Sequence, residues 1–266
     1  MPKLFAKKYI YLWIFSILAI LLLLVGIFMF SQSRAKPKKK ELEPLKSVII
    51  QPTTNHSASV IFLHGLGDNA TNWQKKLEPI ARTYPHVKFI MPQAPEIPVS
   101  MNWGWKMPAW YNIKGNTRDI MNLKEDKAGL LKSVDQIKKI VQSEINSGLP
   151  PQRIIVAGHS QGAAVALAVG LTADCHLAGI IGLSGFLPCR TEIFNWAKSE
   201  NKKTPFFLYH TYYDDVIPAD IGSQSAQLLK EKGYQVEFEG DFNGNHFFDP
   251  EELQEILTKK LKEILP

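Results

Sequence analysis

The residue with the clearest chemical meaning in this sequence is a serine with a glycine two positions away on each side. The pentapeptide Gly158-His159-Ser160-Gln161-Gly162 follows the apolar run Ile154 to Ala157 and precedes the small residues Ala163 to Gly170. This order predicts a strand, a sharp turn and a helix, with the serine exposed on the turn. The glycines leave room where larger side chains would collide with the strand or the helix. Ser160 is therefore a candidate nucleophile.

A serine hydroxyl needs a base and an orienting carboxylate before it can attack a carbonyl at neutral pH. Asp214 follows the apolar run 205–209, which is typical of a buried strand, and His246 follows a glycine- and asparagine-rich loop at 240–245. We expect His246 to be the general base and Asp214 its acid, with the neighbouring Asp215 as the alternative acid. His210 ends the apolar run, and a core histidine bonded to backbone is its expected role.

Acyl transfer also needs backbone donors for the negative charge that develops on the carbonyl oxygen. The apolar run 60–63 predicts a buried strand, and the glycine-containing segment His64 to Asp68 follows it. We expect the N–H groups of Leu66 and Gln161 to form this oxyanion hole. An ordinary glycine turn, with Asp68 or Asn69 capping the next helix, is compatible with that role.

An apolar substrate wall is predicted in the segment 101–113, which looks too irregular for a strand. Its aromatic candidates for substrate binding are Trp103, Trp105 and Trp110, and Phe186 is added from a later segment. Half of this aromatic set could equally belong to the core. The remainder would favour an apolar acyl chain, because burying hydrocarbon is favourable by roughly 25 cal/mol per Å².

Several motifs together resemble the family of acyl-protein thioesterases, carboxylesterases and lysophospholipases, over Val48 to Leu265. Besides the pentapeptide, they are Leu63–Asp68, Pro92–Pro95, Met107–Ile113 and Leu183–Pro188. The resemblance implies an α/β-hydrolase fold with Ser160, Asp214 and His246 as the triad and Leu66 and Gln161 as the oxyanion hole. It implies a serine hydrolase that cleaves carboxylic esters or thioesters of apolar acyl chains through an acyl-enzyme.

Three positions depart from the family pattern. His159 replaces a frequent phenylalanine, Thr211 replaces a glycine in the acid loop, and Asn245 replaces the glycine before the catalytic histidine. These changes concern fine positioning and not the reaction class.

The expected substrate is a small-molecule or lipid acyl ester or thioester, with an acylated protein as a further candidate. A peptidase or acyltransferase on the same scaffold remains an alternative, as does a catalytically silent binding module. No phosphate loop, dinucleotide fingerprint or metal-ligand spacing stands out, so we expect neither a cofactor nor a metal. The leaving group stays open, because a thioester, a carboxylic ester and a lysophospholipid all present the same carbonyl.

The elements that must position these residues alternate between strand and helix along the chain. Apolar residues at helical spacing predict helices that contain Trp73, Leu77 and Ile80, then the segment 130–145, and finally 253–264. This alternation predicts a mostly parallel sheet with helices on both faces. Little sequence is left for a large cap domain.

The N-terminal region differs from the remainder. Tyr9 to Phe30 is a stretch of 22 residues without a charge, which predicts one transmembrane helix. The expected organisation is a short basic segment at 1–8, an anchor at 9–30 that contacts membrane lipid, a basic linker at 31–44 and a catalytic domain at 45–266. A cleavable signal peptide ending near Ser33-Arg34-Ala35 is the alternative. We expect a single-pass membrane protein. The sequence does not assign the side of the membrane on which the catalytic domain lies.

The positive net charge of +6 comes from the same region. Eight of the 31 basic residues lie in the first 40 positions, which contain no acidic residue, so the remaining 23 face 25 acidic residues. The body of the chain therefore lacks the basic excess that nucleic-acid binding requires, and no nucleic-acid partner is expected.

Overall fold

A computed structural model describes residues 16–17, 20–27, 42–115, 125–241 and 244–265. The chain divides into two units, Met1–Glu43 and Pro44–Pro266. The first unit contains helical residues at 16–17 and 20–27, and the second contains the sheets and all the other helices described below.

The predicted transmembrane helix is wrong, and the single-pass membrane localisation falls with it. Within the described ranges, the structure has no helix that is both long enough and apolar enough to cross a bilayer. Spanning the hydrocarbon core takes about 20 consecutive helical residues. The predicted segment 1–8, the rest of the predicted span and most of the predicted linker lie outside the described residues.

The described part of the second unit contains a seven-stranded sheet. Its edge strand β1 runs antiparallel to its neighbour and every other pairing is parallel. In spatial order the strands are β1 (Ser47–Ile50), β3 (Val87–Pro92), β2 (Ala58–Leu63), β6 (Ile154–His159), β7 (Gly179–Leu183), β8 (Phe206–Thr211) and β9 (Val236–Asp241).

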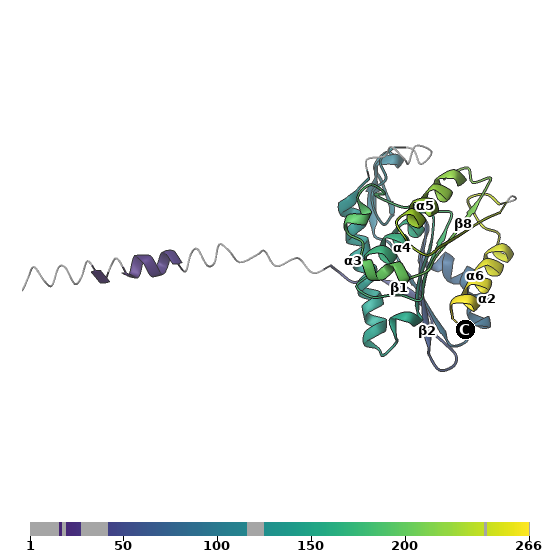
Figure 1. Ribbon diagram of the computed structural model, residues 1–266, viewed down its shortest axis with the longest axis horizontal. Helices are drawn as coiled ribbons and strands as arrows, with labels where there is room; N and C mark the ends of the chain where they lie inside the picture. The colour runs from purple at the N-terminus through teal and green to yellow at the C-terminus, as the bar shows by residue number, and fades with distance from the viewer. Residues whose placement is uncertain (1–15, 18–19, 28–41, 116–124, 242–243, 266) are drawn as a thin grey trace, which may run out of the picture. The chain divides into compact units, whose positions relative to one another are not determined.

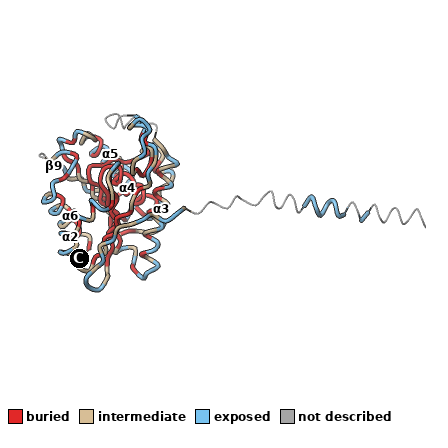
Figure 2. Tube along the Cα trace, turned by 180° about the vertical axis from the view of Figure 1, so that it is seen from behind, coloured by how far each residue is buried: buried red, intermediate tan, exposed pale blue. Residues whose placement is uncertain are grey.

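Helices cover both faces of this sheet (Figure 1). The apolar stripes of α2 (Ala70–Thr83) and α6 (Pro250–Ile264) form one buried cluster with the sheet. The second buried apolar cluster contains residues of the sheet and of three helices, α3 (Lys127–Asn146), α4 (Gln161–Thr172) and α5 (Ala219–Glu231). Figure 2 shows the buried residues concentrated in the layer between them. The predicted mostly parallel sheet with helices on both faces is confirmed.

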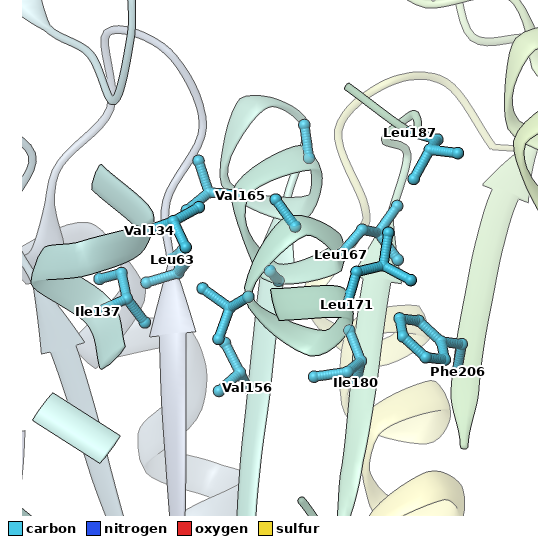
Figure 3. Packing of buried hydrophobic residues seen from close by; sticks show 14 of the residues in the cluster. Leu63, Val134, Ile137, Val156, Val165, Leu167, Leu171, Ile180, Leu187 and Phe206 are labelled. Atoms are coloured by element: carbon cyan, nitrogen blue, oxygen red, sulfur yellow. The ribbon is translucent and has the colours of Figure 1, made fainter. Parts of the chain in front are cut away.

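Helix α4 is buried along its whole length. Its small and aliphatic residues are apolar on every side, which is the pattern of a helix enclosed by protein. Figure 3 shows Val165, Leu167 and Leu171 of α4 among side chains from the strands and α3. The helix that follows Ser160 is thus held rigidly against the sheet.

A small antiparallel pair lies beside the main sheet. It consists of β4 (Glu96–Val99) and β5 (Trp105–Pro108), joined through a 3-10 helix at Ser100–Asn102. The segment 101–113, expected to be too irregular for a strand, therefore contains one. Residues 105–108 form a strand because they pair with residues 96–99, and the composition of the segment did not indicate this pairing.

The register of the main sheet brings the carboxyl ends of its central strands to one edge. Leu63 pairs with Gly158, His159 with Leu183, and Leu183 with Tyr209. The loops that follow β2, β6, β7 and β8 therefore emerge side by side. This is the edge at which open α/β sheets place their binding sites.

Candidate active site

Ser160 occupies a strained turn between β6 and α4. Its backbone has φ 55° and ψ −121°, a combination that residues other than glycine rarely adopt. The turn also requires the two flanking glycines: a Cβ at Gly158 would lie 2.4 Å from the carbonyl carbon of Gly162, and one at Gly162 would lie 2.2 Å from the carbonyl oxygen of Leu63. The sequence pattern thus folds into the sharp turn expected of it.

Three side chains from separate loops meet at this turn in one chain of hydrogen bonds. His246 Nε2 lies 3.0 Å from Ser160 Oγ, and His246 Nδ1 lies 2.7 Å from Asp214 Oδ2. All three residues are buried. The imidazole therefore lies between a hydroxyl that it can deprotonate and a carboxylate that fixes its orientation.

Asp214 is held by more than the histidine. Its Oδ1 accepts hydrogen bonds from the backbone N–H groups of Val216 at 2.9 Å and Ile217 at 2.7 Å. Burial alone would raise the pKa of this carboxyl, but hydrogen bonds from His210, His246 and Ile217 outweigh it and hold the pKa well below its usual range. These hydrogen bonds therefore favour the anionic form of Asp214, whereas Asp215 is exposed.

His210 is a neighbour of the site whose second contact the sequence did not reveal. Its Nε2 donates to the carbonyl oxygen of Ile217 at 2.8 Å, the kind of core bond expected of it, and also lies 3.2 Å from Asp214 Oδ2. The only sequence signal was its position four residues before the acid, at the end of a buried strand.

Leu66 and Gln161, the predicted oxyanion donors, both line the cavity beside Ser160. Neither of their N–H groups donates to an acceptor among the described residues. The N–H of Gln161 is free because it lies in the first turn of α4, where no earlier carbonyl is available, and the positive end of the helix dipole lies there too. Two unpaired donors thus border the space above the serine.

The Gln161 side chain supports the same region. Its Oε1 accepts from the Trp110 N–H at 2.9 Å, and its Nε2 donates to the Tyr111 carbonyl oxygen at 2.7 Å. Trp110 Nε1 in turn donates to the carbonyl oxygen of His64, two residues before Leu66, at 2.8 Å. Trp110, which we expected to bind substrate, is only 2% exposed. It supports the segment that contains His64 and Leu66.

A cavity of about 320 Å³ opens next to Ser160 and His246. Most of the side chains around it are apolar, and they include Leu66, Met101, Ile113, Phe186, Val216 and Phe247. Phe186, one of the predicted substrate-binding residues, is thus a side chain that lines this cavity. Trp103 and Trp105 do not line this cavity: they are 91% and 72% exposed on the turn and strand of the β4–β5 pair. Trp103 caps the 3-10 helix and Trp105 begins β5, and the composition of the segment could not indicate that both are exposed there.

Comparisons with known proteins agree with this geometry. The sequence pattern of a family described as phospholipase/carboxylesterase matches residues 45–262. Acyl-protein thioesterase 1 of Neurospora crassa is 40% identical over 226 residues, covering 82% of this chain and 92% of that protein. Acyl-protein thioesterase 1 of Yarrowia lipolytica is 40% identical over 190 residues, covering 71% and 83%. The crystal structure of Zea mays acyl-protein thioesterase 2 superimposes with a TM-score of 0.73 at 29% identity, covering 83% of this chain and 99% of that one.

Proposed function

This chain belongs to the phospholipase/carboxylesterase family, and from that premise we propose that Ser160, His246 and Asp214 are its catalytic triad. The family relationship makes the protein a serine hydrolase that acts on acyl esters and thioesters. The observation that carries the residue assignment is the continuous hydrogen-bond chain from Asp214 through His246 to Ser160 at the edge of an apolar cavity.

In the first half of the reaction, Ser160 Oγ attacks the acyl carbonyl carbon while His246 Nε2 takes the hydroxyl proton. Asp214 stabilises the imidazolium that forms. When the tetrahedral intermediate collapses, His246 returns the proton to the leaving sulfur or oxygen, and an acyl ester on Ser160 remains. Water then attacks this ester while His246 takes its proton, and His246 returns that proton to Ser160 Oγ as the carboxylic acid leaves.

The negative oxygen of each tetrahedral intermediate would be bound by the N–H groups of Leu66 and Gln161. Both lack an acceptor among the described residues, so neither must break a protein hydrogen bond before it donates. Removing one donor of this kind typically lowers kcat by 10²- to 10³-fold. The Gln161 side chain and Trp110 keep the two donor segments in place.

For the substrate, we propose a long-chain acyl thioester on a protein cysteine. Two observations support this choice: the relatives named above are acyl-protein thioesterases, and the cavity walls at Leu66, Met101 and Phe186 are apolar. Such walls would take the acyl chain, whereas the polar end of the cavity holds the carbonyl at Ser160. The acylated protein itself would stay outside.

The test compares the purified protein with its Ser160→Ala variant on an S-palmitoyl peptide, its O-palmitoyl serine counterpart and a lysophospholipid. We expect the S-acyl peptide to show the highest kcat/KM and Ser160→Ala to lose at least about 10³-fold on every substrate. A fluorophosphonate probe should label the parent and Ser223→Ala, a control at an exposed serine of α5, but not Ser160→Ala.

Two outcomes separate the parts of the proposal. Full activity and labelling in Ser160→Ala would contradict the triad. Faster hydrolysis of the lysophospholipid or the O-acyl peptide would overturn the thioester substrate and leave the triad standing.

A further inference from the structure

The loop that carries His246 is held by side chains that the reaction scheme does not use. Thr211 Oγ1 donates to the carbonyl oxygen of Asn245 at 2.8 Å. His159 Nε2 donates to the carbonyl oxygen of His246 at 2.8 Å. Asn245 Oδ1 accepts from the N–H of Phe247, also at 2.8 Å. The backbone carbonyls of Asn245 and His246 and the N–H of Phe247 are thus all hydrogen-bonded to side chains.

We propose that His159, Thr211 and Asn245 form a clamp that positions His246 for catalysis. This inference rests on the proposed function, in which His246 is the general base. The three are positioning residues, because none of their polar atoms contacts Ser160 Oγ or the His246 ring nitrogens in the hydrogen bonds described.

His159 is the central member of the clamp. Its ring lies 4.9 Å from that of His246 and 5.6 Å from that of Trp73, between centroids. A phenyl ring could fill this space, but it could not donate to the His246 carbonyl. Because Nε2 donates to an oxygen, the proton lies on Nε2. Burial, reinforced by the nearby His246, lowers the pKa of His159 to about 3, so the ring is a neutral donor at neutral pH.

Thr211 connects the clamp to the acid. It is fully buried at the end of β8, three residues before Asp214, so the same strand end fixes the carboxylate and one carbonyl of the histidine loop. His159 is the last residue of β6, directly before Ser160. The strands that deliver the acid and the nucleophile therefore both hold the loop of the base.

Asn245 is the third member of the clamp. Asn245 is exposed, and its side chain forms a local turn with the backbone two residues on, as asparagine commonly does. Three residues that are far apart or on different elements of the chain therefore meet around one loop, where the side chain of each forms one hydrogen bond with its backbone.

The test uses pairs of variants that keep shape but change hydrogen bonding, measured on the full-length protein with an acyl thioester. His159→Phe and Thr211→Val remove one donor each, and Thr211→Ser restores the hydroxyl. We expect kcat to fall roughly tenfold in the first two, with KM within twofold of the parent, and Thr211→Ser to stay within threefold. Fluorophosphonate labelling should slow by the same factor as kcat.

The matched control is Thr172→Val, which removes a buried threonine hydroxyl that donates to the Ala168 carbonyl at the far end of α4. It should lower the midpoint of thermal unfolding as Thr211→Val does, yet leave kcat unchanged. Unchanged kcat in both His159→Phe and Thr211→Val would overturn the clamp, as would a tenfold loss in Thr172→Val. If His159→Phe does not fold, the Thr211→Val and Thr211→Ser pair decides. The triad would remain untouched by these outcomes, because Ser160→Ala tests it separately.

Discussion

At the scale of single residues, burial distinguishes groups that the sequence leaves equivalent. Asp214 and Asp215 are adjacent and chemically identical, and nothing in their spacing chooses between them. The structure places Asp214 against His246 and two backbone N–H groups, whereas Asp215 is exposed. The order of serine, acid and histidine along the chain was readable from the sequence. The choice between the two carboxylates could not be predicted from the sequence, because it depends on the conformation of the loop.

Asp214→Asn should lower kcat by roughly 10³- to 10⁴-fold, because the amide removes the charge that stabilises the imidazolium and can favour the wrong histidine tautomer. Asp215→Asn is the control and should stay within twofold of the parent. Steady-state kinetics on an acyl thioester would measure both. Equal losses in the two variants would contradict the assignment of Asp214.

His159 predicts a pH effect on stability. Its pKa is about 3 in the folded protein and 6.5 in the unfolded chain, so between these values only the unfolded chain takes up the proton. Stability is therefore lost as pH falls below 6.5. Between pH 7.5 and pH 5, the parent should lose about 2 kcal/mol more unfolding free energy than His159→Phe. Urea unfolding at both pH values measures this difference, and parallel losses would show that His159 titrates normally.

At the scale of elements, the turn at Ser160 combines a strained residue with two close backbone approaches. Its glycines were readable from the sequence, because their spacing has a steric cause. The β4–β5 pair was not readable, because its strand at 105–108 depends on a partner at 96–99. Trp105 lies in that strand, Trp103 lies in the connection before it and Trp110 is bonded to Gln161 and His64, so their separate environments could not be inferred from composition.

Gly162→Ala should destabilise the protein by at least about 2 kcal/mol, because its Cβ would overlap the Leu63 carbonyl and force β2 or the turn to move. Gly182→Ala in β7 is the matched control: its Cβ would meet nothing nearer than 3.7 Å, and we expect a change below about 1 kcal/mol. Chemical unfolding of both variants makes the comparison. Similar stabilities would refute the steric account of the turn.

Trp110→Phe should destabilise the protein by about 1–3 kcal/mol, because it leaves the buried His64 carbonyl without its donor. Trp103→Phe, at a residue that is 91% exposed, should remain within about 0.5 kcal/mol of the parent. Thermal unfolding followed by circular dichroism distinguishes the two. An equally large effect at Trp103 would mean that this side chain is packed.

At the scale of the whole molecule, the alternation of strand and helix was readable from the sequence because each element carries its own periodicity. The N-terminal region shows the limit of that reasoning. An uncharged run of 22 residues satisfies the length condition for a membrane helix, yet the residues that the structure describes include no helix long and apolar enough to cross a bilayer. The order β1-β3-β2-β6-β7-β8-β9 also lay beyond sequence reasoning, since it depends on which strands pair.

The division into two units predicts that residues 44–266 fold without the N-terminal region. A chain beginning at Pro44 should have a thermal unfolding midpoint within about 2 °C of the full-length protein, because the two apolar clusters around the main sheet lie within these residues. Its kcat/KM on a short-chain aryl ester should be unchanged. Loss of cooperative unfolding would show that the second unit depends on the first.

The order in which the strands deliver their loops has a consequence for biosynthesis. Ser160, the proposed nucleophile, is synthesised 86 residues before His246, the proposed base, and α6, which contributes to one apolar cluster, follows later still. A nascent chain that already displays the serine therefore has no imidazole to activate it. A product truncated between these two residues would keep the serine and lack the imidazole, and we expect it to be hydrolytically inert.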